Sequence, residues 1–243
     1  MLMKINLLGV QVDSLDMAGT LEKIAGFITA QKPRQVVTLN PEMLFYAQQK
    51  PALKEIINQA HLVTADGVGI LWAAKMAGTP LPARITGIDL VWCLAQKAAG
   101  EGWRIFFLGA LPGVAEEAAA QLQKHYPNLK VAGAFHGYFQ PTEESGVITK
   151  IRQAQPDILF AALGAPKQEV FTARHLRALN VPVCIGVGGS FDVIAGRVKR
   201  MPPWVQKIHL EWLGRLLQEP KRLSRALVLP RFVWLVLKTY RLA

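Results

Sequence analysis

The chain has 243 residues, of which 51% are hydrophobic and 19% charged, and its formal net charge is +11; this is enough for one sizeable α/β domain with a small appendage. Its two cysteines, Cys93 and Cys184, lie among apolar residues, which argues against a disulfide framework or a cysteine-based metal site. The first residues lack the charged head, apolar run and cleavage site of a secretory signal, so we expect a cytoplasmic protein.

Apolar, β-rich runs alternate with helical patterns through most of the chain. The predicted strands are 5–10, 35–39, 62–65, 104–108, 130–134, 157–163 and 183–187. The predicted helices include 15–30, 89–99, 114–126, 143–154 and 167–179. Several strands are apolar throughout instead of alternating, as in parallel strands buried on both faces. The pattern therefore predicts an α/β fold with a Rossmann-like, mostly parallel sheet and helices on both faces.

A boundary is predicted at Gly196, which separates residues 1–196 from a C-terminal helical appendage, residues 197–243. The appendage has 11 basic and 2 acidic residues, so it supplies 9 of the 11 net positive charges, and it holds three of the six tryptophans. Its apolar run at 226–237 is interrupted by Pro230 and is too short for a spanning helix of about 20 residues. Tryptophan beside Lys and Arg on an amphipathic helix is typical of an anchor on an anionic membrane surface.

Two other interpretations of the appendage stay open. In one, a helical pair packs its apolar stripe onto the domain or onto a second subunit, since such stripes usually belong to a core. In the other, a basic arm binds nucleic acid, although this segment is too apolar for a solvated arm that contacts phosphates. We expect contact with a membrane and no nucleic acid, with pairing of subunits as an open alternative away from the membrane.

Polar residues follow the predicted strands, where ligands of open α/β sheets bind. Thr38 and Asn40 end the second predicted strand, and Asp66 ends the third. Asp66 has the chemistry of a general base for an acceptor hydroxyl, but an aspartate at this place is also a good helix N-cap, and the pattern alone favours the cap. Arg84 is a loop cation between apolar residues, for which plain solvent exposure is the alternative.

Glycine turns that lead into helices present N–H groups suited to a diphosphate. Gly109 begins one such turn, and the run from Gly186 to Gly189, just before Asp192, is a second. Each turn alone is also an ordinary end of a strand. Asp192 fits either a cap or a ligand contact. Lys167 and Gln168 follow another strand, where the first turn of a helix is the simpler interpretation.

Several known motifs are missing from the sequence. It has neither the GxGxxG fingerprint of dinucleotide-binding folds nor a P-loop, and its histidines and aspartates show no metal-ligand spacing. We therefore expect no cofactor and no metal. An oxidoreductase is a minor alternative, and a nucleotide- or nucleic-acid-binding module with a basic arm is the alternative from another class.

Seven short segments form an ordered set between residues 8 and 195. They are 38–42, 64–69, 84–89, 107–110, 133–138, 163–169 and 186–192. Together they resemble the WecG/TagA/CpsF family of glycosyltransferases, and they are far more specific than any single turn. The basic, tryptophan-containing appendage is similar to that of the TagA branch of this family.

The resemblance implies a Rossmann-like fold and an inverting, metal-independent reaction. The donor would be UDP-N-acetylmannosamine and the acceptor N-acetylglucosamine on undecaprenyl diphosphate, which gives the linkage-unit disaccharide lipid of wall teichoic acid. Related members of the family use other UDP-sugars, so a different donor is the nearest alternative. The enzyme would be peripheral on the inner face of the cell membrane.

The resemblance also implies roles for individual residues. Asp66 would be the general base. Four further residues would shape the acceptor and donor pocket: Thr38, Asn40, Arg84 and Gln168. Four others would bind the nucleotide or lie near it: Gly109, Tyr138, Lys167 and Asp192. The appendage would fold over the site and bring three arginines towards the diphosphate: Arg215, Arg222 and Arg225.

Overall fold

The computed structural model describes residues 3–199, 201–202 and 227–241, and eight strands lie in this part of the chain. The strands are β1 (Lys4–Leu7), β2 (Val10–Asp13), β3 (Arg34–Leu39), β4 (Leu62–Ala65), β5 (Arg104–Gly109), β6 (Lys130–Phe135), β7 (Ile158–Ala162) and β8 (Val183–Gly186). The helices are α1 (Met17–Thr29), α2 (Pro41–Gln49), α3 (Pro51–Gln59), α4 (Val68–Met76), α5 (Gly87–Glu101), α6 (Val114–His125), the 3-10 turn η1 (Pro141–Glu143), α7 (Glu144–Ala154), α8 (Lys167–Leu179), α9 (Ser190–Ile194) and α13 (Val228–Tyr240).

Six of the strands form one parallel sheet in the order β4-β3-β8-β7-β5-β6. The predicted α/β class and mostly parallel sheet are therefore confirmed. β7 and β8 lie inside the sheet and every residue of both is buried, which explains their continuously apolar sequences. The chain enters the sheet at β3, adds β4 outside it as one edge strand, and then crosses to β5 on the other half of the sheet.

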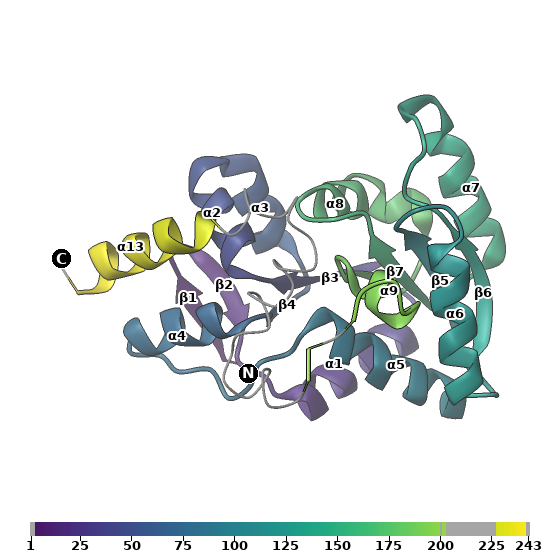
Figure 1. Cartoon of the computed structure of the whole chain (residues 1–243), viewed down its shortest axis with the longest axis horizontal. Coiled ribbons are helices and arrows are strands. Elements are labelled where there is room, and N and C mark those ends of the chain that lie inside the picture. The colour runs from purple at the N-terminus through teal and green to yellow at the C-terminus, as the bar shows by residue number, and fades with distance from the viewer. Residues whose placement is uncertain (1–2, 200, 203–226, 242–243) are drawn as a thin grey trace.

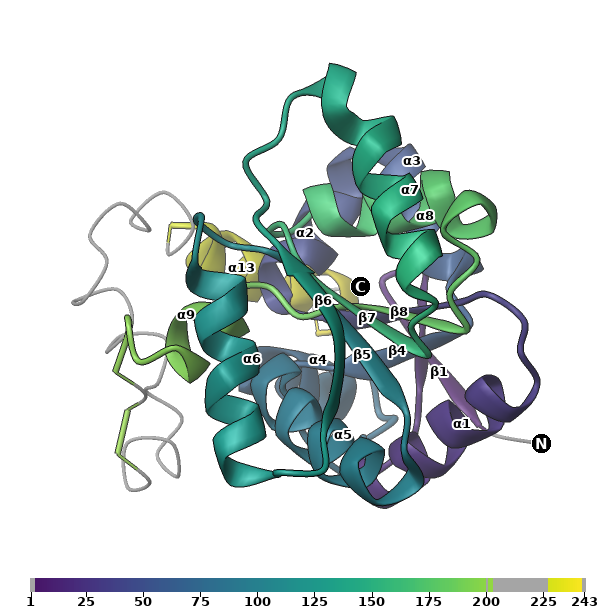
Figure 2. The same ribbon diagram turned by 90° about the vertical axis from the view of Figure 1, so that its right-hand side faces the viewer.

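Helices cover both faces of this sheet, with α3, α7 and α8 on one side and α1, α5 and α6 on the other (Figure 2). Successive residues of a strand point to opposite faces, so the neighbours Phe106 and Phe107 serve different cores. Phe107 packs with Phe160 and with Phe191 of α9 on one face. Phe106 packs with residues of α7 and α8 on the other.

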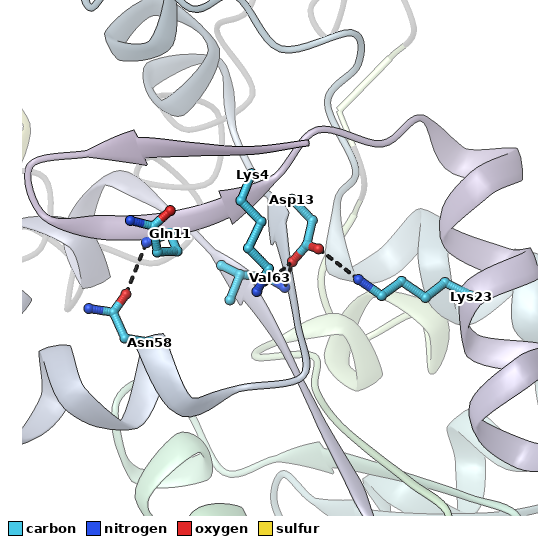
Figure 3. A network of polar contacts seen from close by, with 6 residues as sticks. All are labelled: Lys4, Gln11, Asp13, Lys23, Asn58 and Val63. Atoms are coloured by element: carbon cyan, nitrogen blue, oxygen red, sulfur yellow. Dashed lines mark hydrogen bonds and ion pairs between the residues drawn. The ribbon is translucent and has the colours of Figure 1, made fainter. Parts of the chain in front are cut away.

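The predicted strand at 5–10 is wrong as a single strand. The chain turns back at Leu8 and Gly9, which have φ values of 52° and 79°, and β1 and β2 form a separate antiparallel hairpin. This hairpin is fastened to the edge strand β4 through the buried Asp13, whose carboxylate accepts from the Val63 N–H at 2.9 Å and from Lys23 Nζ at 2.7 Å (Figure 3). An edge strand that would otherwise expose unpaired N–H groups is thereby covered.

The last described helix, α13, packs back onto the domain against α2 and α4 (Figure 1). Its buried residues Val228, Phe232 and Val236 recur every four positions, as an amphipathic helix requires. The expected interruption at Pro230 is wrong, because this proline lies in the first helical turn, where its missing N–H breaks no intrahelical bond. No helix within the described ranges has both the length and the hydropathy needed to cross a membrane.

Candidate functional site

The carboxyl ends of the six parallel strands meet at one edge of the sheet, and the predicted site residues of the domain gather there. In β3 and β4 the last two of the four paired positions are Thr38 with Thr64 and Leu39 with Ala65. Asn40 and Asp66 each follow a paired residue, so they leave the sheet side by side. The sequence predicted this edge as the place of ligand binding, and the topology brings the predicted residues of β3 and β4 together.

Asp66 is held between the ends of two strands and the start of a helix. Its N–H donates to the Leu39 carbonyl at 2.8 Å, and its Oδ2 accepts from the N–H of Gly87, the first residue of α5, at 3.2 Å. The alternative role as N-cap of the following helix is wrong, because Gly67 occupies that position and α4 has no side-chain cap. The half-buried carboxylate is thus oriented by a helix other than its own.

Arg84 lies in the loop that returns to this carboxylate. The next residue, Ile85, donates its N–H to the carbonyl of Ala65 at 2.8 Å, so the loop runs beside the tip of β4. Arg84 itself is half-buried, and solvent exposure alone does not describe it. The loop therefore brings a cation to the strand end that carries Asp66.

Thr38 and Asn40 are both engaged in bonds that shape the edge. The buried Thr38 hydroxyl donates to the Gly186 carbonyl at 2.8 Å and so ties β3 to the end of β8. Asn40 Oδ1 accepts from the Met43 N–H at 2.8 Å and caps α2. In the described chain these two side chains fix the positions of neighbouring backbone, and their contact with a substrate stays a prediction.

Gln168 joins the start of α8 to the glycine turn after β8. Its Oε1 accepts from the Gly188 N–H at 3.0 Å, and its Nε2 donates to Glu169 Oε1 at 2.8 Å. A Cβ atom on Gly186 would lie 2.6 Å from Gln168 Nε2 and 2.7 Å from Glu169 Oε1, so only glycine leaves room for both side chains. Thr38 and Gln168, which come from two separate family segments, therefore meet at the same glycine.

Glu169 is a residue of this edge that the candidate residues did not include. Its side chain is buried, and its Oε2 has no hydrogen-bond partner among the described residues. Burial raises the pKa of this carboxyl to about 7, against the opposing effect of the Gln168 hydrogen bond. The sequence carried no signal for this residue, because its place on the inward face of α8, three residues before the buried Thr172, follows from the packing of the helix.

A second group of predicted residues lies at the ends of β5 and β6. Gly109 has a φ of 135°, and a Cβ atom there would lie 2.4 Å from the Ala162 backbone, so this close approach requires glycine. The Gly137 N–H donates to the Ala110 carbonyl at 2.9 Å. Lys167 Nζ lies 3.5 Å from the Gly137 carbonyl oxygen. Tyr138, which follows Gly137 in the chain, is 68% exposed.

The two groups are joined by the elements between them. Lys167 and Gln168 are consecutive in the first turn of α8, so one helix start serves both halves of the edge. The start of α5 also lies close to the turn after β8, because a Cβ atom on Gly87 would lie 3.2 Å from the Val187 carbonyl oxygen.

Asp192 lies in α9, shortly before the predicted boundary at Gly196. Its carbonyl accepts from the Val198 N–H at 3.0 Å. Arg197 Nε donates to Glu117 Oε2 on α6 at 2.8 Å, and this bond, together with the charges of Glu117 and Asp192, raises the pKa of Arg197. The first residues after Gly196 are thus fastened to the carboxyl edge of the sheet.

Part of the prediction lies outside the described residues. This applies to Arg215, Arg222 and Arg225, and to two of the three tryptophans of the appendage, Trp204 and Trp212. Within the ranges that the structure describes, no three His, Cys, Asp or Glu side chains are grouped as a metal site.

Chemically, the described edge combines an oriented carboxylate with close-packed glycine turns. Asp66 offers an acceptor for a hydroxyl proton, while Arg84 and Lys167 bring positive charge. Backbone N–H groups at the helix starts favour an anion. This set suits a substrate that carries both hydroxyl and phosphate groups.

A family model described as glycosyl transferase WecG/TagA/CpsF matches residues 5–243 of the chain. Two similar proteins carry the name N-acetylglucosaminyldiphosphoundecaprenol N-acetyl-beta-D-mannosaminyltransferase. The one from Bacillus spizizenii is 38% identical over 215 residues, which are 88% of this chain and 83% of the relative. The one from Staphylococcus aureus strain MW2 is 37% identical over 240 residues, which are 98% of this chain and 94% of the relative.

Proposed function

The chain belongs to the WecG/TagA/CpsF family of glycosyltransferases, and we propose that it transfers N-acetylmannosamine from UDP-N-acetylmannosamine to N-acetylglucosaminyl-diphospho-undecaprenol. The product would be the linkage-unit disaccharide lipid of wall teichoic acid. The names of the two relatives support the acceptor and the transferred sugar. The family resemblance of the seven segments supports the UDP donor and an inverting mechanism.

The observation that carries this proposal is the placement of Asp66. The Gly87 N–H binds one carboxylate oxygen at 3.2 Å and so orients the group at the tip of β4, at the edge where ligands of such sheets bind. In the proposed reaction Asp66 takes the proton of an N-acetylglucosamine hydroxyl. The hydroxyl oxygen forms a bond to the anomeric carbon from one face while the bond to UDP breaks on the other. UDP leaves with the electron pair, and the anomeric configuration inverts.

The leaving diphosphate needs positive charge near it. In the described chain Lys167 and Arg84 are the predicted site residues that supply charge, and the turns at Gly109 and Gly186–Gly189, which lack side chains at these glycines, let the diphosphate approach the backbone closely. The predicted contribution of the appendage arginines belongs to the same step. We propose that these groups, without a metal, stabilise UDP as it leaves.

The lipid part of the acceptor requires a membrane surface, and we place the enzyme on the inner face of the cell membrane. The outward face of α13 supports this location. Trp234 on this face is 60% exposed and Val233 is 41% exposed, although both are large apolar residues. Lys238 Nζ lies 5.0 Å from the centre of the Trp234 ring. Exposed tryptophan beside a basic residue is the composition of an interfacial contact.

A donor comparison tests the proposed function. The full-length protein is given a short-chain lipid diphosphate that carries N-acetylglucosamine, together with UDP-N-acetylmannosamine or its C2 epimer UDP-N-acetylglucosamine. We expect release of UDP and a β-linked disaccharide with the first donor, at a rate at least about tenfold above the second, since misplaced substituents cost roughly 1–3 kcal/mol in a specific site. Faster turnover of the epimer would contradict the donor, and an α-linked product would contradict inversion.

A further inference from the structure

The side chain of Glu169 occupies a place where a carboxyl group contributes little to stability. It is 1% exposed, and one of its oxygens has no hydrogen-bond partner among the described residues. Burying such a group costs free energy that a single hydrogen bond offsets only in part. An apolar residue of similar size would avoid this cost. The carboxyl group therefore supplies something other than stability.

What Glu169 supplies is a hydrogen-bond acceptor at one end of the Gln168 amide. A glutamine amide has two chemically different ends, and packing alone hardly distinguishes them. Glu169 Oε1 accepts from Nε2 at 2.8 Å, which turns Oε1 of Gln168 towards Gly188, whose N–H it accepts at 3.0 Å. The glycine at 186 leaves space for this pair, because any Cβ there would overlap both side chains.

The first turn of α8, which carries this pair, is fixed by separate bonds. Gln35 Nε2 on β3 donates to the Glu169 carbonyl at 2.9 Å and to Thr172 Oγ1 at 2.7 Å. The Thr172 hydroxyl in turn donates to the Gln168 carbonyl at 2.8 Å. The backbone of the helix start is thus held by Gln35, whereas the orientation of the Gln168 amide depends on Glu169.

We propose that Glu169 is a positioning residue of the transferase: it sets the orientation of the Gln168 amide, which in turn holds the glycine turn 186–189 in the shape that receives the nucleotide diphosphate. This inference rests on the proposed function for the identity of the ligand. Both the ionised and the protonated carboxyl group carry an oxygen that accepts from Nε2. A glutamine at this position also carries such an oxygen, so the role does not require the charge.

The experiment compares three variants of the full-length protein. Glu169→Ala removes the acceptor, Glu169→Gln keeps it, and Gln35→Ala is the matched control that loosens the same helix turn and leaves the amide pair in place. Calorimetry gives the Kd for UDP, amide hydrogen exchange reports on Gly188, and thermal unfolding gives the Tm. For Glu169→Ala we expect a Kd about tenfold higher, which is the effect of about one lost hydrogen bond, and faster exchange at Gly188.

The other two variants separate positioning from stability. We expect Glu169→Gln to keep both the Kd for UDP and the Gly188 exchange rate within about twofold of the wild type. Gln35→Ala should lower the Tm, while its Kd for UDP and its Gly188 exchange rate also stay within about twofold of the wild type. The proposal is overturned if Glu169→Ala leaves Gly188 exchange unchanged, if Glu169→Gln fails to rescue it, or if Gln35→Ala reproduces the full effect. A wild-type protein that does not bind UDP would contradict the proposed function, while Gly188 exchange would still decide the role of Glu169.

Discussion

At the scale of single residues, Gly186 is the point about which the candidate site is packed. Its carbonyl accepts the Thr38 hydroxyl, and its missing side chain leaves the volume that Gln168 and Glu169 fill. Two strands and one helix therefore converge on one residue. The sequence predicted Thr38 and Gln168 through the family segments, but the contact between them depends on β3 and β8 being neighbours in the sheet. That pairing joins residues far apart in the chain, which local patterns do not specify.

The same scale explains why some residue roles could not be predicted. Asp66 before a helix fits the pattern of an N-cap, and only the folded loop shows that its carboxylate accepts from Gly87 of the next helix. Glu169 was adjacent to a predicted site residue, yet a glutamate in a first helical turn is usually solvated. Its burial follows from the position of α8 against the sheet.

The raised pKa of Glu169 makes the stability of the protein depend on pH. Between pH 4.5, the ordinary pKa of a glutamate, and pH 7, about the pKa of Glu169 in the folded protein, the unfolded chain has lost the proton that the folded protein keeps. The free energy of unfolding attributable to this group is therefore greatest below pH 4.5 and falls as the pH rises towards 7. An amide in place of the carboxyl group does not ionise, so it removes this loss of stability at higher pH.

We therefore expect Glu169→Gln to gain stability relative to the wild type as the pH rises. The difference in the free energy of unfolding should grow by up to about 3 kcal/mol between about pH 4.5 and pH 8. Urea unfolding of both proteins at these two pH values measures it. An equal difference at both values would show that Glu169 does not titrate in this range.

At the scale of elements, α13 is a segment for which the sequence predicts a surface role, and one of its faces is part of the core. Its apolar pattern predicts a membrane contact, with packing onto the domain as the alternative. The described helix does pack onto the domain through one stripe, and the Leu8 N–H donates to the Tyr240 hydroxyl at 2.9 Å. Its opposite face still exposes Trp234. Packing on one face leaves the other face for the proposed membrane contact.

The docking of α13 predicts a large effect of Phe232→Ala. Phe232 is 1% exposed and belongs to the same apolar cluster as residues of β1, α2 and α4. Its removal should lower the free energy of unfolding by about 3–5 kcal/mol, the usual cost of truncating a buried phenylalanine. Val233→Ala, on the exposed side of the same helix, is the control and should cost less than about 1 kcal/mol. Equal effects of the two variants in urea unfolding would contradict the docking.

Two element predictions failed for physical reasons that local patterns hide. The run at 5–10 is continuously compatible with a strand, but Leu8 and Gly9 adopt positive φ and reverse the chain. Non-glycine residues seldom adopt that conformation, so Leu8 gave no turn signal. In α13 the proline at 230 suggested a break, but its position in the first turn makes it compatible with the helix.

At the scale of the whole molecule, the class of fold and the edge that carries the site followed from the sequence. Continuously apolar strands that alternate with helices imply a parallel sheet, and a parallel sheet gathers its strand ends at one edge. The strand order β4-β3-β8-β7-β5-β6 could not be predicted, because the same pattern fits several orders. The division of the chain at residue 196 and the part played by the appendage arginines stay predictions.

The whole site depends on one carboxylate at the edge of the sheet, so the decisive measurement is the turnover of Asp66→Asn compared with its affinity for UDP. The matched control is Asp157→Asn. Asp157 Oδ2 accepts from the N–H of Arg104, the first residue of β5, and so lies where the strands begin, away from the strand ends that carry Asp66. We expect kcat of Asp66→Asn to fall by about 10²–10⁴-fold, the usual contribution of a general base, while the Kd for UDP changes less than about threefold. The control should keep both values. An Asp66→Asn enzyme that retains most of its turnover would contradict the assignment of the base and of the site built around it.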